Sequence, residues 1–145
     1  MRYFLDTNIF LRFLVADNAV AHRDCQLLLE LVEAKRIKAI TSALVFAEIV
    51  WTLQSFYKFP RVKISEALKI LARSGITFDN RMDALRALEW YGAHAIKFID
   101  AMLASHPSVH AGKVVLVSYD RDFDILGVKR IEPREILKRL KIKNE

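Results

Sequence analysis

The sequence predicts an α/β fold in which a parallel sheet of about five strands is covered by helices on both faces. Short apolar segments alternate along the chain with longer amphipathic ones. This is the order in which parallel strands and their crossover helices occur. The chain has 145 residues and an apolar fraction of 53%, which is enough for one domain with a sizeable core. We therefore expect residues 1–145 to form a single domain.

Five apolar segments have the length and composition of strands. The clearest is residues 114–117, a run of four apolar residues with β preference. The last segment, with the sequence VKRI, is weaker and is expected at an edge of the sheet. The predicted strands are residues 3–5, 38–40, 76–78, 114–117 and 128–131.

The segments between these strands carry helical periodicity or helix-start signals. Residues 20–35 repeat leucine at helical spacing, and Ser42 is placed to cap the helix that follows the second strand. Asp79 is placed to cap a helix after the third strand, and Pro133 can occupy the first turn of the last one. The predicted helices are residues 7–15, 20–35, 43–57, 63–73, 80–93, 99–111 and 133–141.

Composition argues against a membrane or secreted protein. The most apolar stretch, residues 43–53, is too short to cross a bilayer and contains Glu48. The N-terminus reaches Asp6 too early for a signal peptide. Cys25 is the only cysteine, so an intrachain disulfide is impossible, and we expect it to be a buried apolar residue. We therefore expect no membrane contact and a cytoplasmic location.

The balance of charge favours a polyanionic ligand. The chain has 23 basic and 17 acidic residues, a formal net charge of +6. If five of the acids gather in one site, the rest of the molecule holds 12 acids against 23 basic residues. An acidic pocket on a basic body suits a phosphodiester chain, although the charge can also serve solubility alone. The surplus of apolar residues indicates a partner protein or a second copy of the chain.

Four carboxylates occupy unusual positions. Asp6 directly follows the first strand and Asp120 closely follows the segment at residues 114–117, so both are expected at the carboxyl edge of the sheet, where ligands bind. Glu48 and Asp100 lie in almost wholly apolar helical segments. Each has an alternative interpretation: a solvent-facing or ion-paired glutamate for Glu48, a first-turn acid for Asp100, and a simple turn for Asp120.

The four acids together indicate a divalent metal ion. Converging carboxylates repel one another unless a cation lies among them, and a hard ion prefers oxygen ligands. The histidines show no spacing that links them to the acids, and we expect them on the surface: His22, His94, His106 and His110. Asn8 can orient a carboxylate or a phosphate, or cap a helix. Ser118 can hydrogen-bond a carboxylate or an attacking water, or lie in a solvated turn.

Four motifs in order resemble the PIN-domain family, and within it the toxin ribonucleases of prokaryotic VapBC toxin–antitoxin modules. They are LDTNIFLR at residues 5–12, SALVFAE at 42–48, FIDA at 98–101 and SYDRDF at 118–123. The resemblance covers nearly the whole chain. It implies a three-layer α/β/α sandwich, Mg²⁺- or Mn²⁺-dependent endoribonuclease activity, a homodimer, and inhibition by a small antitoxin of the VapB type.

The resemblance also assigns roles to residues. The matching positions make Asp6, Glu48, Asp100 and Asp120 the catalytic and metal-binding acids, with Asn8 and Ser118 beside them, and Asp122 a further acid of less certain role in metal binding. The chain departs from the family pattern in two places. Ser118 stands where threonine is common, and residues 95–98 lack a glycine often found before the third acid.

Three other functions remain open from the sequence. One is a PIN-type RNA-processing nuclease outside any toxin system. Another is a phosphatase of the haloacid-dehalogenase type with Asp6 as covalent nucleophile, although such enzymes have a second aspartate where this chain has Asn8. The third is an RNA-binding or partner-binding module without turnover.

A partner protein has a candidate docking place in the sequence. Helices 20–35 and 42–57 are expected to form a groove for an antitoxin segment, with aromatic side chains available on the second helix: Phe46, Trp51, Phe56 and Tyr57.

Overall fold

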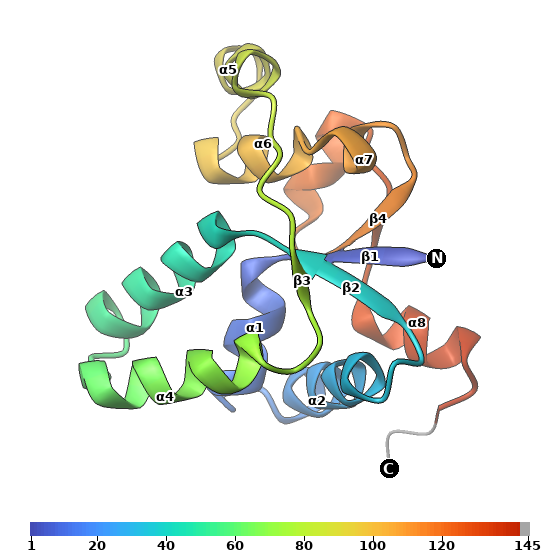
Figure 1. Ribbon diagram of the computed structural model, residues 1–145. Helices are drawn as coiled ribbons and strands as arrows, with labels where there is room; N and C mark the ends of the chain where they lie inside the picture. The colour runs from blue at the N-terminus through green and yellow to red at the C-terminus, as the bar shows by residue number, and fades with distance from the viewer. Residues whose placement is uncertain (143–145) are drawn as a thin grey trace.

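The computed structural model describes residues 1–142 and contains a five-stranded sheet in which every neighbouring pair is parallel. The strand order is β3-β2-β1-β4-β5 (Figure 1). The strands are β1 (Arg2–Leu5), β2 (Lys38–Thr41), β3 (Thr77–Phe78), β4 (Val114–Val117) and β5 (Arg130–Ile131). The predicted parallel sheet is confirmed, and the last strand lies at an edge as expected.

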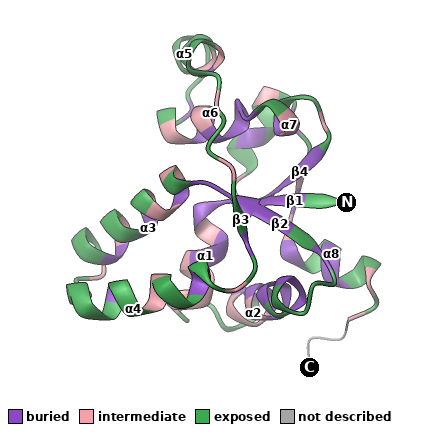
Figure 2. Ribbon diagram, viewed as in Figure 1, coloured by how far each residue is buried: buried purple, intermediate pink, exposed green. Residues whose placement is uncertain are grey.

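Apolar side chains hold the centre of the sheet. All four residues of β4 are buried, and β1 is buried after its first residue. These two strands lie side by side, with Phe4 opposite Leu116 and Leu5 opposite Val117. Figure 2 shows the same contrast between the mostly buried central strands β1, β2 and β4 and the more exposed outer helices. A sheet buried on both faces explains why the strand segments are continuously apolar.

Helices cover both faces of this sheet and complete the α/β/α sandwich. In Figure 1, α2 and α8 lie on one side and α6 and α7 on the other, while α3 and α4 pair at one flank. The helices are α1 (Thr7–Leu14), α2 (Ala19–Glu33), α3 (Ala43–Ser55), α4 (Arg61–Ala72), α5 (Ala84–Ala93), α6 (Phe98–Ala104), α7 (Pro107–His110) and α8 (Pro133–Arg139).

The turn between α2 and β2 has a defined hydrogen-bonded geometry. The N–H of Arg36 donates to the carbonyl of Leu31 at 2.9 Å, and the N–H of Lys35 donates to that of Val32 at 3.0 Å. This pair of bonds is a Schellman motif, which requires a left-handed residue where glycine is usual. Here that residue is Lys35, with φ of 60°. Lys35 therefore has a backbone conformation that is unfavourable for any residue with a side chain.

The helix predicted over residues 80–93 starts later than expected. It begins at Ala84 with Asp83 as its N-cap, and Asp79 does not cap it. The Asp79 carboxylate instead accepts hydrogen bonds from Nε and Nη2 of Arg81 at 3.0 and 2.8 Å. It also lies 3.1 Å from Nε2 of His106. These partners hold the pKa of Asp79 well below its usual range.

The predicted helix over residues 99–111 is two helices, α6 and α7. They are separated at Ser105 and His106 because Pro107 cannot continue a helix from the preceding turn. The expectation that His106 lies on the surface is wrong: its side chain is fully buried, with Nδ1 accepting from the N–H of Ser108. A 3₁₀ helix, η1 (Arg121–Leu126), was not predicted.

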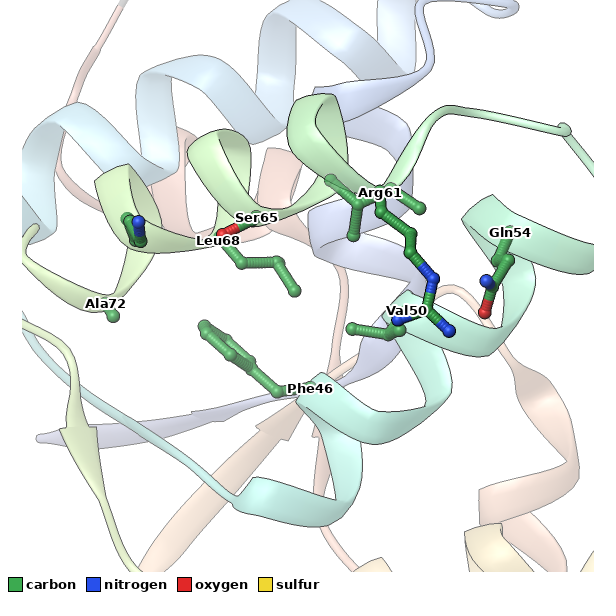
Figure 3. A pocket seen from close by; sticks show the side chains of 9 residues that line it. Phe46, Val50, Gln54, Arg61, Ser65, Leu68 and Ala72 are labelled. Atoms are coloured by element: carbon green, nitrogen blue, oxygen red, sulfur yellow. The ribbon is translucent and has the colours of Figure 1, made fainter.

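The expected groove between helices 20–35 and 42–57 is also corrected. α2 packs against α1 and α8, whereas the groove beside α3 is formed with α4. It has a volume of about 490 Å³, and Figure 3 shows Phe46 and Val50 of α3 facing Leu68 of α4, with Arg61 near one end. Cys25 is buried on α2, as expected.

None of the helices within residues 1–142 has the length and apolar character needed to cross a membrane.

Candidate metal centre

Two of the predicted acids meet where the strand order reverses. β1 is flanked by β2, which follows it in sequence, and by β4, which comes much later. Crossovers on the two sides of β1 therefore run in opposite directions, and this leaves a crevice beyond the carboxyl ends of β1 and β4. Asp6 directly follows β1 and Asp120 lies just beyond β4. The fold thus places both carboxylates at the position where open α/β sheets bind ligands.

Two helices bring the other acids to the same place. α3 carries Glu48 and α6 carries Asp100, and both side chains line a cavity of about 220 Å³ together with Asp6 and Asp120. The remaining lining residues are Thr7, Asn8, Leu11, Thr52 and Lys97. All four acids of the predicted quartet therefore converge, although they are separated by up to 114 positions in the chain.

Burial and mutual repulsion perturb two of these acids strongly. Asp6 is 3% exposed and Asp100 is 5% exposed, whereas Glu48 and Asp120 are half-buried. Burial raises the pKa of Asp100 to about 8, and the charges of Asp6, Asp120 and Glu48 add to the increase. Burial likewise raises the pKa of Asp6 to about 6, against the lowering effect of its hydrogen bond from Ser118. Such carboxylates ionise easily only when a cation is nearby.

Hydrogen bonds fix the orientation of Asp6. The N–H of Thr7 donates to its Oδ1 at 2.7 Å, and the hydroxyl of Ser118 donates to its Oδ2 at 2.7 Å. The Ser118 oxygen in turn accepts from Nδ2 of Asn8 at 3.1 Å and from the N–H of Asp120 at 3.0 Å. Ser118 thus uses its hydroxyl to hold a carboxylate, which was one of the two interpretations open from the sequence.

Asn8 contacts Asp6 only indirectly, through Ser118. Its amide nitrogen donates to Ser118, and its Oδ1 accepts from the N–H of Tyr119 at 3.4 Å. Through these two bonds Asn8 ties α1 to the segment after β4. It orients the serine that orients Asp6, and it also lines the cavity itself.

Asp122 does not join the other acids. Its side chain is exposed on η1, and it does not line the cavity. Its backbone N–H donates to Oδ1 of Asp120 at 2.9 Å. Asp122 therefore stabilises, through its backbone N–H, the turn that holds Asp120.

Four cavity residues were not identified from the sequence: Thr7, Leu11, Thr52 and Lys97. Thr52 lies four residues after Glu48 on α3, and Lys97 lies three residues before Asp100 at the start of α6. Both spacings place side chains on the same helical face, so helical periodicity could have identified them. Lys97 is a cation at the edge of an acidic cavity, and its charge lowers the pKa of Asp100.

The cavity suits a hard divalent ion. The negatively charged groups that line it are carboxylates, and Mg²⁺ and Mn²⁺ prefer such oxygen ligands. Oδ2 of Asp100 and Oγ1 of Thr7 are buried without a hydrogen-bond partner among residues 1–142, so both can accept one. Within the same residues no three acidic, histidine or cysteine side chains are already assembled as a metal cluster.

Ser118→Ala is expected to lower the affinity of the site for Mn²⁺ by about tenfold, because Asp6 then loses the donor that orients it. Ser118→Thr retains the hydroxyl and should bind Mn²⁺ much better than the alanine variant. Isothermal titration with Mn²⁺ measures both affinities. Equal affinities for the wild type and Ser118→Ala would show that the serine does not position Asp6.

An all-parallel α/β sheet with a carboxylate cavity at its topological switch point places the chain among α/β proteins whose ligand site lies beyond the carboxyl ends of the strands. The comparison with protein families is more specific. The PIN domain model matches residues 3–129, and the chain therefore belongs to the PIN-domain family. Membership of this family implies nuclease activity. No curated protein sequence matches the chain.

Solved structures with the same fold are toxin–antitoxin complexes. The structure of VapBC2 from Rickettsia felis bound to a promoter DNA fragment aligns with a TM-score of 0.61 and 19% identity, over 91% of this chain and 98% of that one. VapBC-1 from nontypeable Haemophilus influenzae gives 0.61 and 18%, over 92% and 99%. A toxin–antitoxin complex from Klebsiella pneumoniae gives 0.56 and 18%, over 90% and 97%. At these identities the likeness establishes the fold alone.

Proposed function

We propose that the chain is a Mg²⁺- or Mn²⁺-dependent endoribonuclease and the toxin of a toxin–antitoxin pair. The observation that carries the proposal is the convergence of Asp6, Glu48, Asp100 and Asp120 on one cavity. The raised pKa values of Asp6 and Asp100 support it, because buried carboxylates that repel one another favour the binding of a cation. Membership of the PIN-domain family supports nuclease chemistry.

The reaction is hydrolysis of a phosphodiester bond. Water attacks phosphorus, the bond from phosphorus to the leaving oxygen breaks, and that oxygen takes up a proton. A divalent ion, when bound, lowers the pKa of water and stabilises the negative charge that develops on the phosphate oxygens.

The chain's own residues bind, orient and transfer protons. Asp6, Glu48, Asp100 and Asp120 are the proposed ion ligands. Either Asp100 or Asp120 accepts the proton of the attacking water. Ser118 keeps Asp6 in place, and Lys97, at the rim, is placed to contact a phosphate oxygen of the substrate.

The phosphatase alternative has less support. Such a phosphatase has a second aspartate two residues after the nucleophile, whereas this chain has Asn8 there, and the Asn8 amide donates to Ser118. The family match also favours a nuclease. An RNA-processing nuclease outside a toxin system would have the same site. A neighbouring antitoxin gene would distinguish a toxin from such a nuclease.

The proposed partner is a small antitoxin of the VapB type. Two of the similar solved structures are of VapBC complexes and a third is of a toxin–antitoxin complex, which supports such a partner. The groove between α3 and α4 is the proposed place for its apolar segment. Val50 lines this groove and is 36% exposed, and Trp51 and Phe56 on the same helix are 67% and 73% exposed.

We also propose that residues 1–145 act as one PIN-like nuclease domain in a cytoplasmic homodimer; residues 143–145 lie outside the described part. Exposed apolar side chains on α5 support self-association. Leu85, Leu88 and Tyr91 recur every third residue, and more than half of the surface of each is exposed. This spacing places them on one face of the helix.

An RNA digestion panel tests the proposed activity. Purified protein is incubated with a mixture of structured and single-stranded RNAs in Mg²⁺, in Mn²⁺ and in EDTA. We expect cleavage in one or both metals and none in EDTA. Cleavage that persists in EDTA would contradict the proposed role of the carboxylates. RNA binding without cleavage in either metal would instead favour a module without turnover.

A further inference from the structure

The edge of the sheet opposite the carboxylate cavity is strongly basic. Arg2 begins β1 and Lys38 begins β2, and the turn before β2 contributes Lys35 and Arg36. All four residues are exposed. We call this surface the basic edge and define it by these four residues. In Figure 1 it lies at the ends of β1 and β2 nearer the N-terminus, away from the starts of α1 and α3.

The basic edge is concave. Two hollows of about 540 and 490 Å³ lie on it, and both are lined by Arg2, Lys35, Ile37 and Lys38. Arg36 lines the larger one. No acidic residue of the described chain lines either hollow. The hollows therefore combine a shape that can receive a chain with charge of one sign.

The cations of the basic edge are not neutralised by neighbours. Arg2 and Lys38 are register partners on adjacent parallel strands, an arrangement in which like charges repel. Within residues 1–142 none of the four basic-edge cations forms an ion pair. Bound anions would relieve this repulsion.

The backbone presents these cations rigidly. The Schellman bonds of Arg36 and Lys35 fix the turn, and Lys35 keeps its side chain at a position where glycine is usual. The register with β1 fixes Lys38 beside Arg2. Cations fixed in place lose less conformational freedom on binding than cations on a flexible tail.

We propose that the basic edge binds the sugar–phosphate backbone of RNA away from the cleavage site. Phosphates spaced along a chain match several cations in two adjoining hollows better than one small anion does. With four-residue strands the basic edge lies roughly 13 Å from the carboxyl ends, so a structured RNA can contact both edges. The choice of RNA as the polyanion rests on the proposed function, whereas the phosphate-binding surface is independent of it.

Binding is measured by fluorescence anisotropy with a labelled single-stranded RNA in EDTA, which prevents metal-dependent cleavage. The test variant combines Arg2→Gln, Lys35→Gly and Lys38→Gln. We expect its affinity to fall about tenfold, and the slope of log K against log salt to become shallower by about 2, because three phosphate contacts are lost. The single variant Lys35→Gly should show a smaller loss in the same direction.

The chain offers a matched control for Lys35→Gly. Lys58 is also exposed with a left-handed φ, 58°, and belongs to the connection between α3 and α4. Figure 1 shows this connection on the side of the molecule away from the N-terminus. Lys58→Gly removes the same charge and relieves the same backbone conformation, so it should bind RNA like the wild type. Both glycine variants should melt no lower than the wild type, so weaker binding by Lys35→Gly cannot be attributed to unfolding.

Three results would overturn the proposal. The first is a triple variant that binds RNA with the affinity and salt slope of the wild type. The second is an equal loss in Lys35→Gly and Lys58→Gly, which would show only a general charge effect. The third is stronger binding of poly-glutamate than of RNA at the same site, which would indicate an acidic protein segment. Cleavage in Mn²⁺ is assayed separately, so failure of the nuclease proposal is distinguishable from failure of this one.

Discussion

Replacing Asp6 with asparagine is expected to abolish metal-dependent RNA cleavage while the protein remains folded. Asp6 is the most buried acid of the cavity and lies at the junction of β1 and α1. Asparagine has nearly the same shape and keeps one oxygen that can accept the bond from the N–H of Thr7, while an amide group replaces the oxygen that accepts from Ser118. It removes the negative charge, however, and with it a ligand for the ion. We expect the cleavage rate to fall by at least about 100-fold.

The measurement is the initial rate of RNA cleavage in Mn²⁺, with circular dichroism and thermal melting to confirm the fold. Glu66→Gln is the matched control because it removes one acid from α4 without touching the cavity. The control should cleave RNA at the rate of the wild type. Wild-type cleavage by a cleanly purified Asp6→Asn protein would remove the proposed site, and a contaminating nuclease would appear as equal activity in all three preparations.

The position of two of the acids could be predicted from the sequence because a parallel sheet restricts where a residue that follows a strand can lie. Asp6 directly follows one apolar strand segment and Asp120 closely follows another, and adjacent parallel strands end at the same edge. Glu48 and Asp100 stood out because each charge interrupts an apolar segment. What the sequence alone did not fix is that α3 and α6 turn these acids toward the same cavity, since that depends on how the helices pack.

The failed predictions for Asp79 and His106 depend in part on contacts between distant residues. Asp79 follows a strand and looks like a helix cap, but Arg81 and the buried His106 bind its carboxylate instead. Asp83 then caps α5 with a local hydrogen bond to the N–H of Arg86. The burial of His106 is equally non-local, because its ring packs against Phe4 of β1 at 5.6 Å between centroids. Periodicity contains no information on such pairings.

The largest expected effect on stability is that of Asp100→Asn in metal-free protein. An aspartate in an unfolded chain has a pKa near about 3.9, whereas that of Asp100 in the folded protein is about 8. Between these values the folded protein holds a proton that unfolding releases. The stability of the metal-free wild type should therefore fall as the pH rises from about 4 to about 8.

The asparagine variant has no such proton at position 100. Asp6, whose pKa is about 6, still titrates in both proteins, so the two proteins should differ in slope by the contribution of Asp100, from about pH 4 to about pH 8. At pH 8 in EDTA we expect the variant to be more stable than the wild type by roughly 2 kcal/mol, because it no longer buries a charge among Asp6, Glu48 and Asp120. Urea unfolding at several pH values measures this difference.

Adding Mn²⁺ should reverse the order of stability. An ion that binds the folded state stabilises it by about 2.7 kcal/mol at 100 times its dissociation constant, and Asp100→Asn lacks one of the proposed ligands. The wild type should therefore gain stability at pH 8, whereas the variant gains little. Two proteins with parallel pH profiles in EDTA and equal gains in Mn²⁺ would mean that Asp100 neither resists ionisation nor binds the ion. If mutual repulsion among the four acids explains the metal site, removing one acid must stabilise the metal-free protein and must reduce the stability of the protein with Mn²⁺ bound.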